Sequence, residues 1–235
     1  MNAQVMYEFK DGVGVITMDD GKANALSLQM IADLDAVVDR AEQDGAVLVL
    51  AGRAGRFSGG FDLKVLMSLS PQTPVLHKAG FQLAHRLLGY PGPVVIACTG
   101  HAIAMGVFLV LSGDYRIGIA GGDFKMVANE VALGLTMPRS AIAICRQRLT
   151  PAAFERAMLL SEVFTPDAAV AAGFLDEVVP ADELLPTALA KAKALAALDR
   201  CAVTSTKLRA RAETLARLQE AIELDDADIL AMVAG

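Results

Sequence analysis

The sequence predicts an α/β fold, because buried strands and helical segments alternate along it and a helical region follows them. Residues 46–50 and 93–98 are branched apolar runs with the length of buried strands. Around them, apolar residues recur at three- and four-residue steps. Such strand–helix–strand units favour parallel pairing with a right-handed crossover. At 235 residues the chain is long enough for one sizeable core.

The N-terminal segment predicts two strands and a helix. The strands span residues 5–9 and 13–18, joined by Asp11-Gly12, which is a hairpin turn signal. A loop follows over residues 21–27, in which Asn24 turns the chain and Ser27 caps a helix. That helix is predicted over residues 27–44 from its apolar spacing.

The stretch Arg56–Leu63 reads Arg-Phe-Ser-Gly-Gly-Phe-Asp-Leu and lies between a strand and a short helix predicted over residues 61–69. Its two adjacent glycines allow positive φ angles and a close backbone approach to a ligand. Asp62 opens the helix, which leaves the N–H of Phe61 free to face a negative oxygen. A glycine pair alone is more typical of a tight strand-to-helix turn with nothing bound.

A second glycine-containing stretch, Thr99–Gly106, follows the strand over residues 93–98. Before it, Pro71 and Pro74 precede a helix predicted over residues 75–88. After it, an apolar helix runs to Leu111. The run from 93 to 112 has the hydropathy of a membrane span, but Thr99-Gly100-His101 divides it into a strand and a helix that are each too short. We therefore expect a buried central helix and no membrane association.

The remaining elements are predicted from cap and turn signals. Thr150-Pro151 and Thr165-Pro166 each start a helix, and Gly173 ends the second one before a last strand. Strands are also expected over residues 115–119 and 124–126, a helix over 138–148, and Ala- and Leu-rich helices from residue 182 onward.

Composition excludes several classes of function. The formal net charge is −6, no basic face dominates, and Trp is absent, so we expect no nucleic-acid partner. Cys98, Cys145 and Cys201 are far apart and are expected to be free thiols in a reducing compartment. The three histidines have no metal-ligand spacing with them, so no metal site is expected. No secretory signal is visible, and a cytoplasmic location is expected.

Together the two stretches resemble the crotonase (enoyl-CoA hydratase/isomerase) family. The resemblance extends to Asp114-Tyr115-Arg116-Ile117, to Asn129-Glu130 and to residues 171–179. It implies a crotonase-type ββα spiral over residues 1–180 and a helical oligomerisation region over 181–235. It also implies a homotrimer or dimer of trimers, and an acyl-CoA substrate that brings coenzyme A with it, with no permanently bound cofactor.

The resemblance assigns roles to individual residues. The backbone N–H groups of Phe61 and Met105 would bind the thioester oxygen of the acyl-CoA. Met105 occupies a usual glycine position, but its N–H is retained. The residues expected to contact the coenzyme A part are Lys22, Ala23, Ala25, Ser58, Gly60, Phe61 and Leu63. Lys64, Lys207 and Arg209 are further candidates for its phosphates, although such side chains are usually solvated.

Glu130 is the expected general base. Hydratases of the family use two glutamates, and the resemblance places one at Phe108, which cannot titrate, and the other at Glu130. One carboxylate is enough to move a proton from C2 to C4 of an enoyl thioester, so double-bond isomerisation is favoured. Apolar neighbours, among them Val127 and Val131, favour burial of Glu130 and a raised pKa. An exposed turn carboxylate is the alternative.

Other functions remain open. Hydration of an enoyl-CoA, binding of acyl-CoA without turnover, and a structural trimer module are the alternatives. A Clp-type serine peptidase is excluded because Ala104 replaces its nucleophile. Ser58 has no neighbouring base in its motif, and His101 is expected to make a local structural hydrogen bond.

Overall fold

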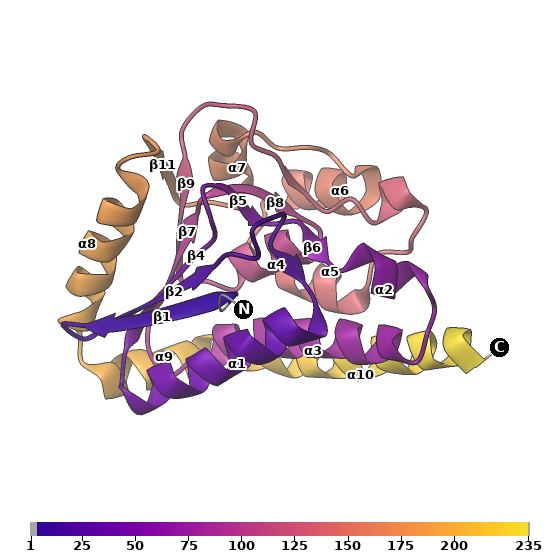
Figure 1. Cartoon of the computed structure of the whole chain (residues 1–235), viewed down its shortest axis with the longest axis horizontal. Coiled ribbons are helices and arrows are strands. Elements are labelled where there is room, and N and C mark those ends of the chain that lie inside the picture. Colours follow the sequence, from indigo (N-terminus) through magenta and orange to yellow (C-terminus); the bar gives the residue numbers. More distant parts are fainter. Residues whose placement is uncertain (1–3, 235) are drawn as a thin grey trace.

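The computed structural model describes residues 4–234, which form a spiral of strand–turn–helix units with helices wrapped around it (Figure 1). The main sheet has six strands in the order β1-β2-β4-β7-β9-β11. The pair β1–β2 is antiparallel and the other neighbours are parallel, as the α/β prediction requires. The strands are β1 Val5–Lys10, β2 Val13–Met18, β4 Val47–Ala51, β7 Val94–Cys98, β9 Tyr115–Ile119 and β11 Glu177–Val179.

Two small sheets continue from the carboxyl ends of the main strands. One is parallel in the order β10-β8-β5, and the other is the parallel pair β3–β6. Their strands are β3 Ala25–Leu26, β5 Gly55–Ser58, β6 Gly60–Phe61, β8 Gly100–Ile103 and β10 Met126–Val127. Strand β8 was not predicted, because Thr99-Gly100-His101 looks like a break. Pairing with β5 and β10 on its two sides makes it a strand. The strand predicted over 124–126 lies slightly later, as β10.

The helices lie on both faces of the main sheet. Figure 1 shows α8 on one side and α1, α3 and α10 on the other. Val47 and Val49 of β4 belong to the core facing α8, whereas Leu48 and Leu50 face the larger core, so this strand is buried on both faces. The helices are α1 Leu28–Gln43, α2 Leu63–Met67, α3 Gln72–Gly89, α4 Met105–Leu111, the 3₁₀ turn η1 Val131–Leu133, α5 Arg139–Arg146, α6 Pro151–Leu160, α7 Pro166–Ala172, α8 Leu184–Ala196, α9 Arg200–Ala210 and α10 Ala212–Ala234.

Most helix signals in the sequence are confirmed. Ser27, Thr150 and Thr165 each accept a hydrogen bond from the first turn of their helix, and Gly173 ends α7 with φ 95°. The helix predicted from residue 75 begins earlier, at Gln72. It can include Pro74 because the first turn of a helix has no acceptor for its N–H groups. Helices α2 and α5 are shorter than the predicted 61–69 and 138–148.

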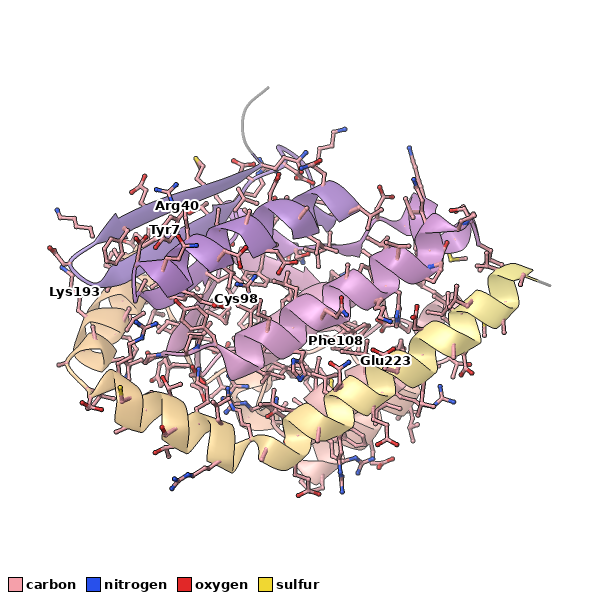
Figure 2. All side chains as sticks on the ribbon, turned by 90° about the horizontal axis from the view of Figure 1, so that it is seen from below. Tyr7, Arg40, Cys98, Phe108, Lys193 and Glu223 are labelled. Atoms are coloured by element: carbon pink, nitrogen blue, oxygen red, sulfur yellow. The ribbon has the colours of Figure 1, made fainter. Side chains whose placement is uncertain are left out.

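The C-terminal helices pack onto the spiral. Leu218 and Ile222 of α10 belong to the larger core, and α10 runs alongside α3, as Figure 2 shows from below. Lys78 of α3 forms ion pairs with Glu223 and Asp226.

Helix α4 is buried along its whole length, which agrees with the prediction of a central helix. Within residues 4–234, no helix combines the length and apolar character that a membrane span requires. The same residues contain no cluster of three His, Cys, Asp or Glu side chains suited to a metal ion.

Candidate active site

Three parallel strands place the predicted catalytic groups together. Strands β5, β8 and β10 pair side by side in the same direction, so their carboxyl ends meet at one edge. Phe61 follows β5, Met105 follows β8, and Glu130 follows β10. The carboxyl edge of parallel strands is where α/β proteins commonly bind ligands.

The first loop lies directly against the second. A Cβ atom on Gly60 would lie 2.8 Å from the carbonyl oxygen of Ile103 and 3.3 Å from the backbone nitrogen of Met105. Gly60 also has φ 87°, which L side chains rarely adopt. A Cβ on Gly106 would lie 2.6 Å from the carbonyl oxygen of Ser58. Glycine is therefore needed on both sides for the two candidate N–H donors to approach each other.

The N–H of Phe61 points away from strand β3. In the β3–β6 pair, the N–H of Asp62 donates to the carbonyl of Leu26 at 3.2 Å. Because successive N–H groups of a strand point to opposite sides, the preceding N–H faces the other way. Asp62 caps α2 by accepting from the N–H of Lys64, so the predicted role of Asp62 is confirmed.

Met105 begins α4, so its N–H belongs to the first turn and has no acceptor within the helix. The residue before it, Ala104, has φ 49° and ψ −123°. That combination is strained for a residue with a side chain and costs on the order of 1–3 kcal/mol. The N–H of Ala104 donates to the carbonyl of Val127, which ties the turn to β10.

Glu130 is buried, with 9% of its surface exposed, and its Oε2 has no hydrogen-bond partner. Burial raises the pKa of Glu130 from 4.5 to about 7. Its neighbour across the core is Cys145 of α5, whose thiol pKa is raised by burial and then by the Glu130 carboxylate. The predicted burial and raised pKa are confirmed, although Val131 is exposed and does not contribute to them.

Aromatic rings surround Phe108, the position to which the family resemblance assigns the other glutamate of hydratases. Phe108 is fully buried and stacks on Phe81 with ring centroids 5.8 Å apart. Phe81 in turn packs on His77 at 4.8 Å and on Phe61 at 6.1 Å. His77 was not singled out from the sequence, because one histidine in an amphipathic helix carries no pattern.

The predicted coenzyme A contacts lie around the first loop. Lys22 and Ala23 are exposed, Leu63 is 51% exposed, and Ala25 pairs with Gly60 across β3 and β6. Ser58 is buried, and its hydroxyl donates to the carbonyl of Asn24 at 2.8 Å and accepts from the N–H of Gly60. Ser58 therefore holds the loop in shape.

Asn24 and His101 have structural roles. The amide of Asn24 donates to the carbonyls of Met18, Arg56 and Phe57, which fixes the first loop against β2. His101 lies in strand β8, not at a helix start, and its Nδ1 accepts from the N–H of Lys125, so its hydrogen bond is structural, as expected, but not local.

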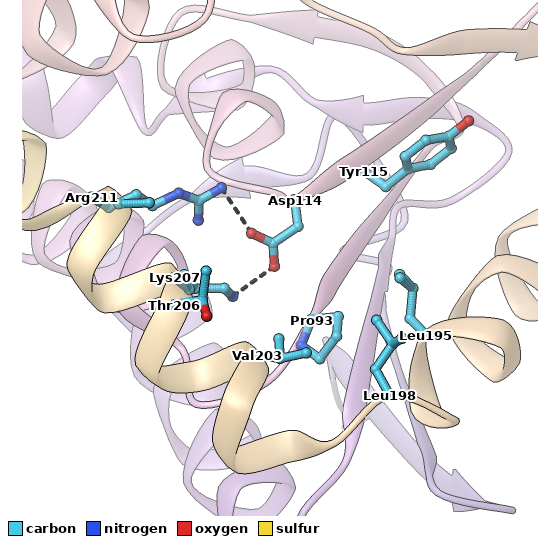
Figure 3. A pocket seen from close by; sticks show the side chains of 10 residues that line it. Pro93, Asp114, Tyr115, Leu195, Leu198, Val203, Thr206, Lys207 and Arg211 are labelled. Carbon is cyan, nitrogen blue, oxygen red and sulfur yellow. Dashed lines mark ion pairs between the residues drawn. The ribbon is translucent and has the colours of Figure 1, made fainter.

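The suggestion that Lys207 binds a coenzyme A phosphate is wrong. Lys207 is buried, pairs with Asp114 at 2.6 Å and donates to the carbonyls of Tyr90 and Gly92. Lys207 and Asp114 line a cavity of about 330 Å³ between the amino ends of β7 and β9 and the helices α8 and α9 (Figure 3). Arg211 also pairs with Asp114 there, at 2.8 Å. The cavity lies at the opposite end of the strands from Glu130, and its charges are paired within the fold.

Comparison with known proteins identifies the family of the chain. The family model for enoyl-CoA hydratase/isomerase matches residues 8–232. Human mitochondrial enoyl-CoA delta isomerase 1 is 30% identical over 226 residues, which cover 93% of this chain and 72% of that protein.

Solved structures of the same fold include proteins named for either activity. The structure of an enoyl-CoA hydratase from Mycobacterium marinum has a TM-score of 0.93 and 44% identity, and the match covers 97% of this chain and 100% of that chain. The apo structure of an enoyl-CoA isomerase from Mycobacterium tuberculosis also has a TM-score of 0.93, with 43% identity over 97% of this chain and 99% of that one. By sequence and by fold, the chain belongs to the enoyl-CoA hydratase/isomerase family of crotonase enzymes.

Proposed function

We propose that this enzyme isomerises the double bond of a 3-enoyl-CoA to the 2-enoyl-CoA through an enolate. The observation that carries the proposal is Glu130: a buried carboxyl group whose Oε2 has no hydrogen-bond partner, at the strand edge that also carries Phe61 and Met105. The position that the resemblance matches to the first glutamate of hydratases holds Phe108.

The proton follows one path. Ionised Glu130 removes a proton from C2, and the electron pair of the C–H bond delocalises onto the thioester oxygen as an enolate. The protonated carboxyl then returns the same proton to C4, which moves the double bond to C2–C3. A pKa of about 7 suits both halves of this cycle, because near neutral pH the group can accept and return a proton.

The two N–H groups stabilise the enolate oxygen. Each such donor is worth about 3 kcal/mol of barrier in other oxyanion holes. The close packing of Gly60 and Gly106 supports this role, since it holds the donors in place before the charge develops. The strained turn at Ala104 supports it too, because strain of this kind concentrates at functional sites.

Hydration is the second candidate, since relatives are named hydratases. It would require Glu130 alone to activate water beside the buried Phe81–Phe108 stack. That stack has no group to orient or protonate a water molecule, so we expect hydration to be slow.

The test compares a 3-enoyl-CoA with a 2-enoyl-CoA of equal chain length. We expect rapid isomerisation of the first, abolished by Glu130→Gln, and little hydration of the second. The matched control is Glu155→Gln, which changes an exposed carboxylate of α6. Fast hydration would overturn the argument from Phe108. Tight acyl-CoA binding without turnover of either thioester would identify a binding protein.

The proposal extends to substrate contacts and assembly. Coenzyme A arrives as part of the substrate and lies along Lys22, Ala23 and Leu63 at the rim of the first loop. Residues 181–235 act as an oligomerisation region, in a homotrimer or dimer of trimers, and light scattering of the purified protein tests this. The free thiols Cys98, Cys145 and Cys201 favour a reducing, cytoplasmic setting.

A further inference from the structure

His77 is a buried polar side chain that the proposed reaction does not use. It lies on α3 with 4% of its surface exposed, and its Nε2 has no hydrogen-bond partner. Leaving such a group unpaired costs about 1–3 kcal/mol. A buried polar atom without a partner within the protein is a candidate for pairing with a ligand.

The ring of His77 lies one aromatic side chain away from the proposed oxyanion hole. Phe61 offers its N–H to the thioester oxygen, and its own ring reaches α3. There it covers Gly80, where an added Cβ would lie 2.3 Å from Phe61 Cε1. The rings of Phe61 and His77 have centroids 5.9 Å apart. An acyl chain leaving the thioester along this ring therefore comes within reach of His77.

The surroundings of His77 decide which ligand group it suits. Phe61 and Phe81 line it on the side of the site, and Thr73, one turn away on α3, uses its hydroxyl to bond the carbonyl of Val65. Burial lowers the pKa of His77 to about 4, and the carboxylates of Asp225 and Asp226 on α10 act in the opposite direction. The imidazole is therefore neutral at physiological pH. The two aspartates would repel an anionic acyl substituent.

We infer that His77 forms a hydrogen bond with an uncharged oxygen on the acyl chain, so that the preferred substrate is an enoyl-CoA carrying a hydroxyl or keto group rather than a plain hydrocarbon chain. A neutral imidazole has one donor and one acceptor nitrogen, and can serve either group. This inference rests on the proposed function for the placement of the thioester. A site built to bind a polar group discriminates against an analogue that lacks it, because the buried partner is then left unpaired.

The experiment compares a plain 3-enoyl-CoA with the same thioester carrying a hydroxyl or keto group at successive positions beyond the double bond. We expect wild-type kcat/KM to be about tenfold higher or more for at least one oxygenated substrate. His77→Leu should remove that preference and leave the plain substrate as good or better. His77→Gln should keep part of it, because its amide still forms hydrogen bonds. His85→Leu makes the same change at a half-buried position on the same helix, and should preserve the preference.

Outcomes separate this inference from the proposed function. If wild type and His77→Leu both isomerise plain and oxygenated acyl thioesters with equal kcat/KM, the inference is overturned and the proposed function is unaffected. If neither substrate is isomerised, calorimetry measures the affinity for the corresponding saturated acyl-CoAs. Tighter binding of the oxygenated acyl-CoA by wild type, but not by His77→Leu, supports the inference. Equal binding of both esters, or binding of neither, overturns it. Thermal melts of each variant verify folding.

Discussion

The burial of Glu130 has a measurable consequence for stability. Its pKa is about 7 in the folded enzyme and 4.5 in an unfolded chain, a difference of roughly 2.5 units. At about 1.4 kcal/mol per pKa unit, ionised Glu130 destabilises the fold by about 3.5 kcal/mol. Below pH 4.5 the carboxyl is protonated in both states and this penalty is absent. Between 4.5 and about 7 the unfolded chain ionises first, so the free energy of unfolding falls as pH rises.

The variant Glu130→Gln keeps the shape of the side chain and removes its titration. We expect it to gain stability relative to wild type between about pH 4 and about pH 8, by about 3 kcal/mol. Burying the glutamine amide in place of the carboxyl can also change the free energy of unfolding, but this contribution is the same at both pH values. It therefore cancels when the stability differences at the two pH values are subtracted. Urea unfolding of both proteins at one protein concentration measures the difference, with Glu155→Gln as the exposed control.

The reasoning fails if the stability difference between Glu130→Gln and wild type is the same at both pH values. Glu130 would then be solvated and ionised throughout, and its proposed role as a base with a near-neutral pKa would lose its physical basis. Loss of activity in a variant that is more stable at high pH would instead show a group retained for function at a cost in stability.

Three further outcomes are expected. First, kcat/KM for a 3-enoyl-CoA should rise with pH and be half-maximal near 7, because Glu130 must be ionised to take the proton; a flat pH profile would contradict this. Second, Gly60→Ala should lower kcat at least tenfold while substrate binding persists. The added Cβ would lie 2.8 Å from the carbonyl oxygen of Ile103, beside the N–H of Met105. An unchanged kcat would show that the close approach of the two loops is not critical. Third, Asp225→Asn should lower the free energy of unfolding, measured with urea, by about 1–3 kcal/mol. The reason is that the Asp225 carboxylate accepts hydrogen bonds from both the N–H and the hydroxyl of Ser140. A smaller loss would mean that α10 is held mainly by apolar contacts.

The sequence predicted the elements whose causes are local. The branched runs 46–50 and 93–98 form strands that bury apolar side chains on both of their faces. The threonines of the two Thr-Pro pairs cap helices as expected. Strand β8 was missed because its formation depends on partners outside its own segment. The two pairing strands, β5 and β10, lie far from each other along the chain.

The site was predicted only in part for the same reason. Glu130 was expected to be buried from its apolar neighbours, and Val127 and Ala128 are buried with it, whereas Val131 is exposed. The interaction of Glu130 with the buried thiol of Cys145 on α5 is a contact that no local pattern predicts. Lys207 shows the converse: an apparently solvated lysine is buried because Asp114 and two carbonyl groups, all distant in sequence, surround its ammonium group.

Among the described residues, five buried side-chain atoms have no hydrogen-bond partner, and three of them belong to segments discussed for the candidate site: Nε2 of His77, Oδ1 of Asn129 and Oε2 of Glu130. The other two, Nε2 of Gln147 and Nε of Arg148, follow helix α5. Ser58 and Asn24, which are also buried, are fully engaged in holding the loops. Because Gln147 and Arg148 also leave atoms unpaired, a missing partner does not by itself mark a ligand site. The stronger case is Glu130, where burial, a raised pKa and a position just after β10 coincide, as the proposed proton transfer requires.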